Sequence, residues 1–133
     1  MTFYIRVKEA VPQPVLIKDR CFLTYGAKVA HREQTLEVEK GATVGANYGV
    51  VNNGGSGKVA VQLWDTRSNK EVARKEYYLE GGEQRIEGFT FTANADMDLV
   101  YYALYWDGSK WVQADVYGSP GSKVDIIGYL REG

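Results

Sequence analysis

The chain contains a single cysteine, Cys21, and a single histidine, His31. One cysteine cannot form an intramolecular disulfide, and the two residues together cannot supply a cysteine cluster or a multi-histidine metal site. The disulfide frameworks of small secreted domains are therefore excluded, and a reducing compartment is favoured. We expect no metal and no cofactor.

Excess charge of one sign and long apolar runs are also lacking. Sixteen basic and seventeen acidic side chains are mixed along the sequence, so we expect no nucleic-acid partner. No apolar run reaches the roughly 20 residues of a transmembrane helix, so we expect no membrane insertion. Residues 1–8 alternate between apolar and polar and lack the apolar core of a secretory signal. If the chain is complete, these features favour a cytoplasmic or virion location.

What the sequence does contain is a two-residue hydrophobic period. Val59, Val61 and Leu63 alternate with polar residues, as in a half-buried strand, and no window shows a helical period. Turn signals recur about every 8–12 residues, the strongest at residues 52–57. The 133 residues are enough for one ordinary domain, so we predict a single all-β sandwich over residues 1–133. The residues expected in its core are Val44, Val61, Leu63, Phe89, Phe91, Leu104 and Val112.

Four segments in the middle of the chain carry a family resemblance. Residues 39–44 (EKGATV) enter a long strand, and residues 50–55 (VVNNGG) end it. Residues 59–65 (VAVQLWD) follow as the next strand, and residues 79–83 (LEGGE) form the turn before an aromatic strand. In this order they resemble the CARDB family, modules of bacterial and archaeal surface proteins, over about residues 36–117.

The resemblance implies an immunoglobulin-like antiparallel β-sandwich used for adhesion, spacing or presentation. Residues 1–35 and 118–133 fall outside it, and we expect them to add strands at both ends of the chain. It implies no catalytic residue. CARDB modules usually occur in tandem inside large exported proteins, whereas this chain is short and carries one such region. That format suits a small viral or archaeal subunit of a virion, a filament or a cell-surface assembly.

Candidate catalytic groups are few. His31 is interpreted as a solvent-facing residue, and Cys21 as a buried thiol because apolar residues follow it. Residues 53–58 (NGGSGK) have the glycines and lysine of a phosphate-binding loop, but a strand follows instead of the required helix. We therefore predict that the protein is not an enzyme and has no catalytic residues.

Acidic residues alternate in one polar loop. Asn94, Asp96 and Asp98 could supply oxygen ligands to calcium, but the loop lacks the glycine and the terminal glutamate of an EF-hand. A solvated turn is the favoured interpretation, and the calcium alternative stays open.

Aromatic residues are abundant. Trp106 and Trp111 flank one hairpin turn and could form a flat platform for a sugar ring or a protein. The alternative is cross-strand packing, which stabilises a hairpin by about 0.2–1 kcal/mol. Trp64 is out of phase with the apolar residues of its own strand. Trp64, Trp106 and Trp111 are the candidate ligand or partner surface.

The last apolar segment, residues 123–130, is a candidate shared strand. Val124, Ile126, Ile127 and Tyr129 make it apolar enough to need a partner surface. It is expected either to pair beside residues 3–7 of its own sandwich or to add to a neighbouring subunit.

Taken together, these features favour a non-enzymatic structural or adhesion module that acts by self-association or by contact with another protein. The alternative is a carbohydrate-binding sandwich that contacts polysaccharide through its surface tryptophans.

Overall fold

The computed structural model describes residues 11–127, apart from the side chains of residues 119 and 120. In this part of the chain the prediction of an all-β fold is confirmed, since the single helical element is one 3-10 turn, η1 (Lys18–Arg20). The strands are β1 (Pro14–Leu16), β2 (Phe22–Tyr25), β3 (Lys28–Ala30), β4 (Thr35–Val38), β5 (Ala42–Asn52), β6 (Gly57–Asp65), β7 (Lys70–Leu79), β8 (Gln84–Ala93), β9 (Met97–Trp106) and β10 (Trp111–Ile126).

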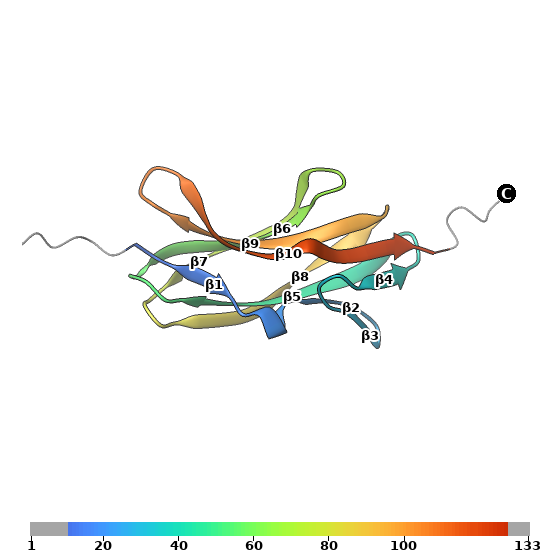
Figure 1. Ribbon diagram of the computed structural model, residues 1–133, viewed down its shortest axis with the longest axis horizontal. Helices are drawn as coiled ribbons and strands as arrows, with labels where there is room; N and C mark the ends of the chain where they lie inside the picture. The colour runs from blue at the N-terminus through green and yellow to red at the C-terminus, as the bar shows by residue number, and fades with distance from the viewer. Residues whose placement is uncertain (1–10, 128–133) are drawn as a thin grey trace, which may run out of the picture.

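The strands form two sheets that pack face to face (Figure 1). In the first sheet, β5 pairs with β8 on one side and with β1 and β2 on the other, and β3 lies beyond β2. The second sheet has the order β4-β10-β9-β6-β7, in which β4 runs parallel to β10 and the other neighbours are antiparallel. The β6–β7 and β9–β10 hairpins rise from the outer side of this second sheet (Figure 1).

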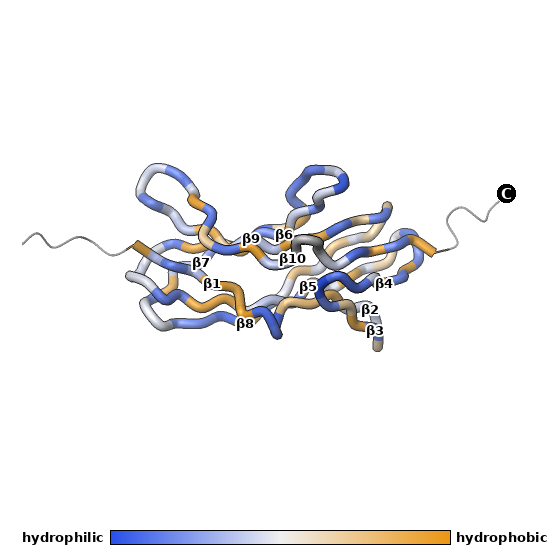
Figure 2. Tube along the Cα trace, in the orientation of Figure 1, coloured by the Kyte–Doolittle hydropathy of each residue, from blue (hydrophilic) through white to orange (hydrophobic). Residues whose placement is uncertain are grey.

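The core lies between the sheets. Hydrophobic positions follow the strands, and the β6–β7 loop is hydrophilic (Figure 2). Val44, Val61, Leu63 and Phe89 are buried in the core as predicted. Phe91 is half-buried and packs against it.

Two predicted core residues lie elsewhere. Leu104 is 8% exposed, but it alternates with Ala103 and Tyr105, which contact the core, and so belongs to the outer face of the second sheet. Val112 pairs with Tyr105, is half-buried and does not belong to the core cluster. Because β9 is apolar on both faces, its alternation cannot show which face is inside.

The C-terminal apolar segment continues β10 as one long strand. Val124 pairs with Leu36 of β4 on one side and with Met97 of β9 on the other, so it does not present a free edge. Val124 is fully buried, Ile126 packs against the core and Ile127 is exposed. The partners of the segment in this sheet are β4 and β9; residues 3–7 and Tyr129 lie outside the described residues.

Residues 118–122 form an irregularity inside β10. The register with β9 shifts between Tyr117 and Ser122. Gly118 has a φ of +101°, which favours glycine, and a Cβ at Gly121 would overlap the carbonyl oxygen of Leu99. These two glycines therefore permit a bulge within the strand.

Within residues 11–127 there is no helix long and apolar enough to span a bilayer.

Candidate functional site: an aromatic groove on the second sheet

The β9–β10 hairpin brings Trp106 and Trp111 together as directly opposite residues. The carboxylate of Asp107 closes the turn: its Oδ1 accepts hydrogen bonds from the backbone amides of Ser109 (2.8 Å) and Lys110 (2.9 Å). These bonds hold the pKa of the Asp107 carboxyl below its usual range. The hairpin is therefore fixed by local backbone contacts, which set the positions of both indoles.

The two indoles pack edge to face, with ring centroids 5.4 Å apart and planes at 66°. Trp106 and Trp111 therefore do not form the flat platform considered from the sequence. The geometry is that of the alternative, an aromatic cross-strand pair.

Cationic side chains from the neighbouring strands approach this pair. The guanidinium carbon of Arg74, on β7, lies 4.8 Å from the Trp111 ring centroid, and Lys58 Nζ, on β6, lies 5.8 Å from that of Trp106. Arg74 is held in turn by Glu76, with 3.0 Å between Nε and Oε2. Cations at such distances are attracted to the negative faces of aromatic rings.

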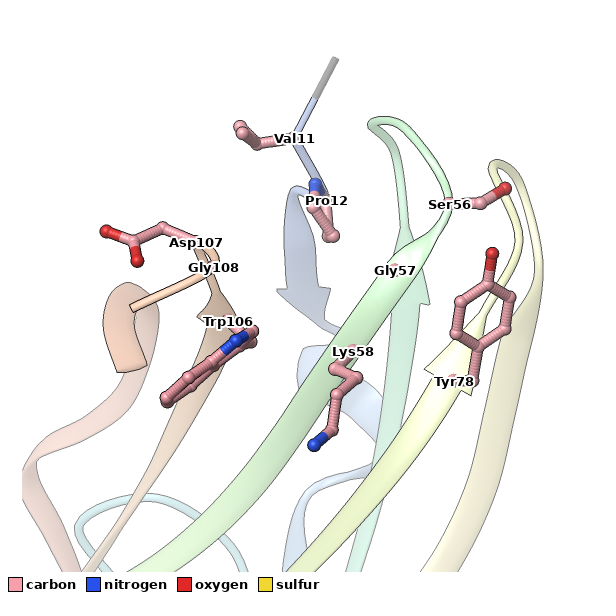
Figure 3. A pocket seen from close by; sticks show the side chains of 9 residues that line it. All are labelled: Val11, Pro12, Ser56, Gly57, Lys58, Tyr78, Trp106, Asp107 and Gly108. Atoms are coloured by element: carbon pink, nitrogen blue, oxygen red, sulfur yellow. The ribbon is translucent and has the colours of Figure 1, made fainter. Parts of the chain in front are cut away.

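An open groove of about 350 Å³ lies beside the indole of Trp106. Trp106 on β9 and Tyr78 on β7 form its two walls, and Lys58 on β6 projects between them (Figure 3). Tyr78 is 63% exposed, the highest value among the large hydrophobic side chains of the described residues. The groove is lined by Val11, Pro12, Ser56, Gly57, Lys58, Tyr78, Trp106, Asp107 and Gly108.

The N-terminal part of the described chain closes one end of this groove (Figure 3). Pro12 is buried against β6, where a Cβ on Gly57 would lie 2.6 Å from Pro12 Cγ. Glycine at position 57 therefore permits the close packing that positions Pro12. The groove combines aromatic walls with the ammonium group of Lys58, whereas the carboxylate of Asp107 is directed away from it (Figure 3).

Of the three tryptophans predicted as a surface, Trp106 lines the groove and Trp111 packs against Trp106. Trp64 lies at the far end of β6, where it pairs with Val100 of β9, and it does not line the groove. Sequence reasoning missed Tyr78 and Arg74. In the sequence, Tyr78 and Arg74 are marked only by their alternation with inward-facing residues of the same strand. That alternation does not show which residues lie beside them on neighbouring strands.

The acidic loop is only partly engaged by backbone contacts, since Asp98 Oδ1 is buried without a hydrogen-bond partner among the described residues. Asp96 Oδ1 accepts a hydrogen bond of 2.8 Å from the Ile126 amide. Asp65, which is buried, accepts bonds from the amide of Asp98 (3.0 Å) and the hydroxyl of Ser68 (2.6 Å). Burial opposes ionisation of Asp65, but the bond from Ser68 and those from backbone amides outweigh it and hold its pKa below the usual range. No cluster of three or more His, Cys, Asp or Glu residues suited to a metal ion occurs in the described part.

Cys21, the candidate nucleophile, and His31, the candidate base, lie in different surroundings. Cys21 is buried, its Sγ lies 3.4 Å from the carbonyl oxygen of Ile17, and burial raises the pKa of its thiol to about 11. His31 is exposed, and its ring packs on Phe22 with centroids 5.4 Å apart. The thiol is therefore neutral near pH 7.

Comparison with known proteins gives little. No family model and no curated protein matches the chain. Among solved structures, the chain is similar to the sporulation control protein Spo0M from Bacillus subtilis, with 15% sequence identity and a TM-score of 0.35. The match covers 90% of this chain and 50% of that protein, so the chain spans about half its length.

Proposed function

We propose that the protein is a non-catalytic interaction module with an immunoglobulin-like fold, and that it contacts a segment of a partner protein through the groove between Trp106 and Tyr78. A subunit of a filament, a virion or a cell-surface assembly would use a module of this kind. The groove supplies the contact site, and the sandwich holds it in place.

The strand order supports the immunoglobulin-like assignment. In variable-type immunoglobulin domains, strands B and E share one sheet, and strands G, F, C and C′ are neighbours in the other. Assigning β5 and β8 to B and E, and β10, β9, β6 and β7 to G, F, C and C′, reproduces this arrangement. The CARDB-like segments fall on the same strands, since residues 39–44 lead into β5 and residues 59–65 lie in β6.

The observation that carries the proposal is the exposed aromatic wall of the groove. Binding energy at protein interfaces is concentrated in a few residues, and Trp, Tyr and Arg are enriched among them. Here Trp106 on β9 and Tyr78 and Arg74 on β7 lie on the same face of the second sheet, on either side of β6, and Tyr78 is mostly exposed. A side chain inserted between Trp106 and Tyr78 would remove apolar surface from water on both sides.

The surroundings of Cys21 and His31 support a non-catalytic role. A nucleophilic cysteine needs a thiolate and access to substrate, whereas burial keeps the Cys21 thiol neutral. A general base must lie within hydrogen-bond reach of the group that it deprotonates. The hydrogen bond that the Cys21 thiol donates goes instead to the backbone carbonyl of Ile17.

A saccharide is the second candidate ligand, and the polar groups beside Trp106 favour it. Lys58 lines the groove, so a hydrogen-bond donor lies next to an aromatic face, and the hydroxyl of Tyr78 lies at the other wall. A sugar ring presents an apolar C–H face for stacking and hydroxyl groups at its edge. The same groove could therefore hold one ring between Trp106 and Tyr78.

Selection from a random-peptide display library, run beside an array of defined oligosaccharides, tests both candidates. We expect the protein to select peptides whose binding is lost in Tyr78→Ala and Trp106→Ala and kept in Trp64→Ala, the control outside the groove. Oligosaccharide binding with the same pattern would favour the second candidate. Ligands of either kind that bind the groove variants and the wild type equally would contradict the groove as the contact site.

A further inference from the structure

β8 is an edge strand with one open side. It pairs with β5 in an unbroken register from Ala93 opposite Ala42 to Gln84 opposite Val51, and no other strand of residues 11–127 pairs with it. Along an antiparallel strand, the hydrogen-bonding groups of successive residues point to alternate sides. Glu83 and Ala93 direct their carbonyl groups toward the β5 side. The even-numbered residues of β8 therefore direct theirs outward.

The open side of β8 lacks a bulge and a proline, and Lys75 of β7 reaches it at Gly88. Natural edge strands are shielded by bulges, prolines or outward charges. β8 has neither a bulge nor a proline, and Ile86 is 47% exposed. One outward group, the Gly88 carbonyl, accepts a hydrogen bond of 2.9 Å from Lys75 Nζ of β7. A carbonyl oxygen has a second lone pair and can accept another bond. The outer-face side chains of β8 are uncharged: Gln84, Ile86, Gly88, Thr90 and Thr92.

The charges of β8 are arranged symmetrically about Ile86. Arg85 and Glu87 flank it on the opposite face of the strand, and their side chains are 37% and 35% exposed. If β8 pairs antiparallel with β8 of a second copy about a two-fold axis at Ile86, each Arg85 lies opposite the other copy's Glu87. Opposite charges in directly facing positions stabilise a strand pair.

Other registers lose this match. An axis at Glu87 would bring two carboxylates face to face, which is destabilising. An axis at Gly88 would place Glu87 opposite Phe89. With the axis at Ile86, the two Ile86 residues form a hydrogen-bonded pair, and each Gln84 exchanges backbone bonds with Gly88 of the other copy. The outward direction of the backbone hydrogen-bonding groups and the pairing of opposite charges thus favour the same register.

We propose that the protein forms a symmetric dimer by antiparallel pairing of β8 with β8 of a second copy, with the two-fold axis at Ile86. The pairing joins the two five-stranded sheets that contain β8 into one continuous sheet. Such an interface is self-complementary and closes at two subunits. This inference goes beyond the ligand proposed for the groove, because β8 contributes no residue to the groove.

Sedimentation of the full chain over a range of concentrations tests the dimer. We expect the mass to rise from 14.9 kDa toward twice that value. Ile86→Lys should stay monomeric, because two ammonium groups would meet at the axis. Val29→Lys is the matched control: Val29 is 49% exposed and lies on β3, at the opposite edge of the same sheet. A wild type that stays monomeric at every concentration would overturn the dimer, as would an Ile86→Lys variant, folded by circular dichroism, with the wild-type mass.

Cysteine cross-linking tests the register. In a hydrogen-bonded antiparallel pair the Cα atoms are about 5.5 Å apart, within the span of a disulfide. We expect oxidised Ile86→Cys to run as a covalent dimer and Thr90→Cys, which would face Gly82 of the other copy, to run as a monomer. Cys21 is buried in every variant and should not contribute. A dimer in which Ile86→Cys fails to cross-link would place the interface elsewhere and leave the groove proposal standing.

Discussion

The hydroxyl of Tyr77 on β7 donates a hydrogen bond of 2.7 Å to Glu87 Oε2 on β8, and this bond joins the edges of the two sheets. The Tyr77 hydroxyl is also hydrogen-bonded to that of Tyr48, which is fully buried on β5. Lys75 contributes from β7, with 3.3 Å between its Nζ and Glu87 Oε2. A buried hydroxyl in the core is thus connected to charged groups at the rim.

We expect Tyr77→Phe to destabilise the fold, because it leaves the Tyr48 hydroxyl buried without this partner. An unsatisfied buried polar group costs about 1–3 kcal/mol. Urea unfolding measures the difference. Tyr78→Phe is the matched control, since Tyr78 is the next residue and is mostly exposed, and it should unfold like the wild type. If Tyr77→Phe had the same free energy of unfolding as the wild type, the hydrogen bond between Tyr48 and Tyr77 would not contribute to stability.

The same network gives stability a defined pH dependence. The bond from Tyr77 and the ammonium of Lys75 hold the pKa of Glu87 below its usual range. The unfolded chain therefore binds the proton at higher pH, near the ordinary glutamate value of about 4.3. The contribution of Glu87 is present above that pH and is lost as the pH falls through the folded pKa.

We accordingly expect Glu87→Gln to lose less stability than the wild type between neutral pH and about pH 3. Urea midpoints over this range give the comparison. Equal losses in the two proteins would show that the carboxylate of Glu87 does not contribute to acid sensitivity.

The Asp65 carboxylate should be an important structural contact between the β6–β7 loop and β9. Asp65→Ala removes the carboxylate oxygen that accepts hydrogen bonds from the amides of Arg67 and Asp98. We expect it to lower the free energy of unfolding by about 1–3 kcal/mol. Ser68→Ala removes only the bond from its hydroxyl and should cost less. Thermal or urea unfolding ranks the two variants, and the reverse order would refute the role assigned to Asp65.

The phenylalanines of β8 should differ, although the sequence placed both in the core. Phe89 is buried, so Phe89→Ala should cost about 3–5 kcal/mol. Phe91 is half-buried, so Phe91→Ala should cost less. Unfolding free energies for the two variants test this ranking, which equal losses would contradict.

Alternation predicted the strands and much of the core because burial on one face imposes a period of two. On β6, Val59, Val61 and Leu63 follow this rule and are fully buried. The rule failed on β9 because Leu104 faces outward yet is covered by its neighbours. The alternation could not predict the groove, because Tyr78 and Trp106 line it together only as a result of the strand order β9-β6-β7.

The end of the chain was harder to predict for a related reason. Glycines at positions 118 and 121 suit a turn and a bulge equally well. Only the pairing of Val124 with both Leu36 and Met97 distinguishes the two. Hydrogen-bond partners across a sheet are non-local and are not contained in the local pattern.

The groove is tested most directly by the affinity of a library-selected peptide for the wild type and for Tyr78→Ala. Tyr78 is mostly exposed, so its truncation should leave the fold intact. A central interface residue is worth about 2 kcal/mol or more, so we expect binding to weaken by roughly 30-fold or more in Tyr78→Ala and to stay unchanged in Trp64→Ala. Equal affinity for the wild type and Tyr78→Ala would contradict the groove as the binding site.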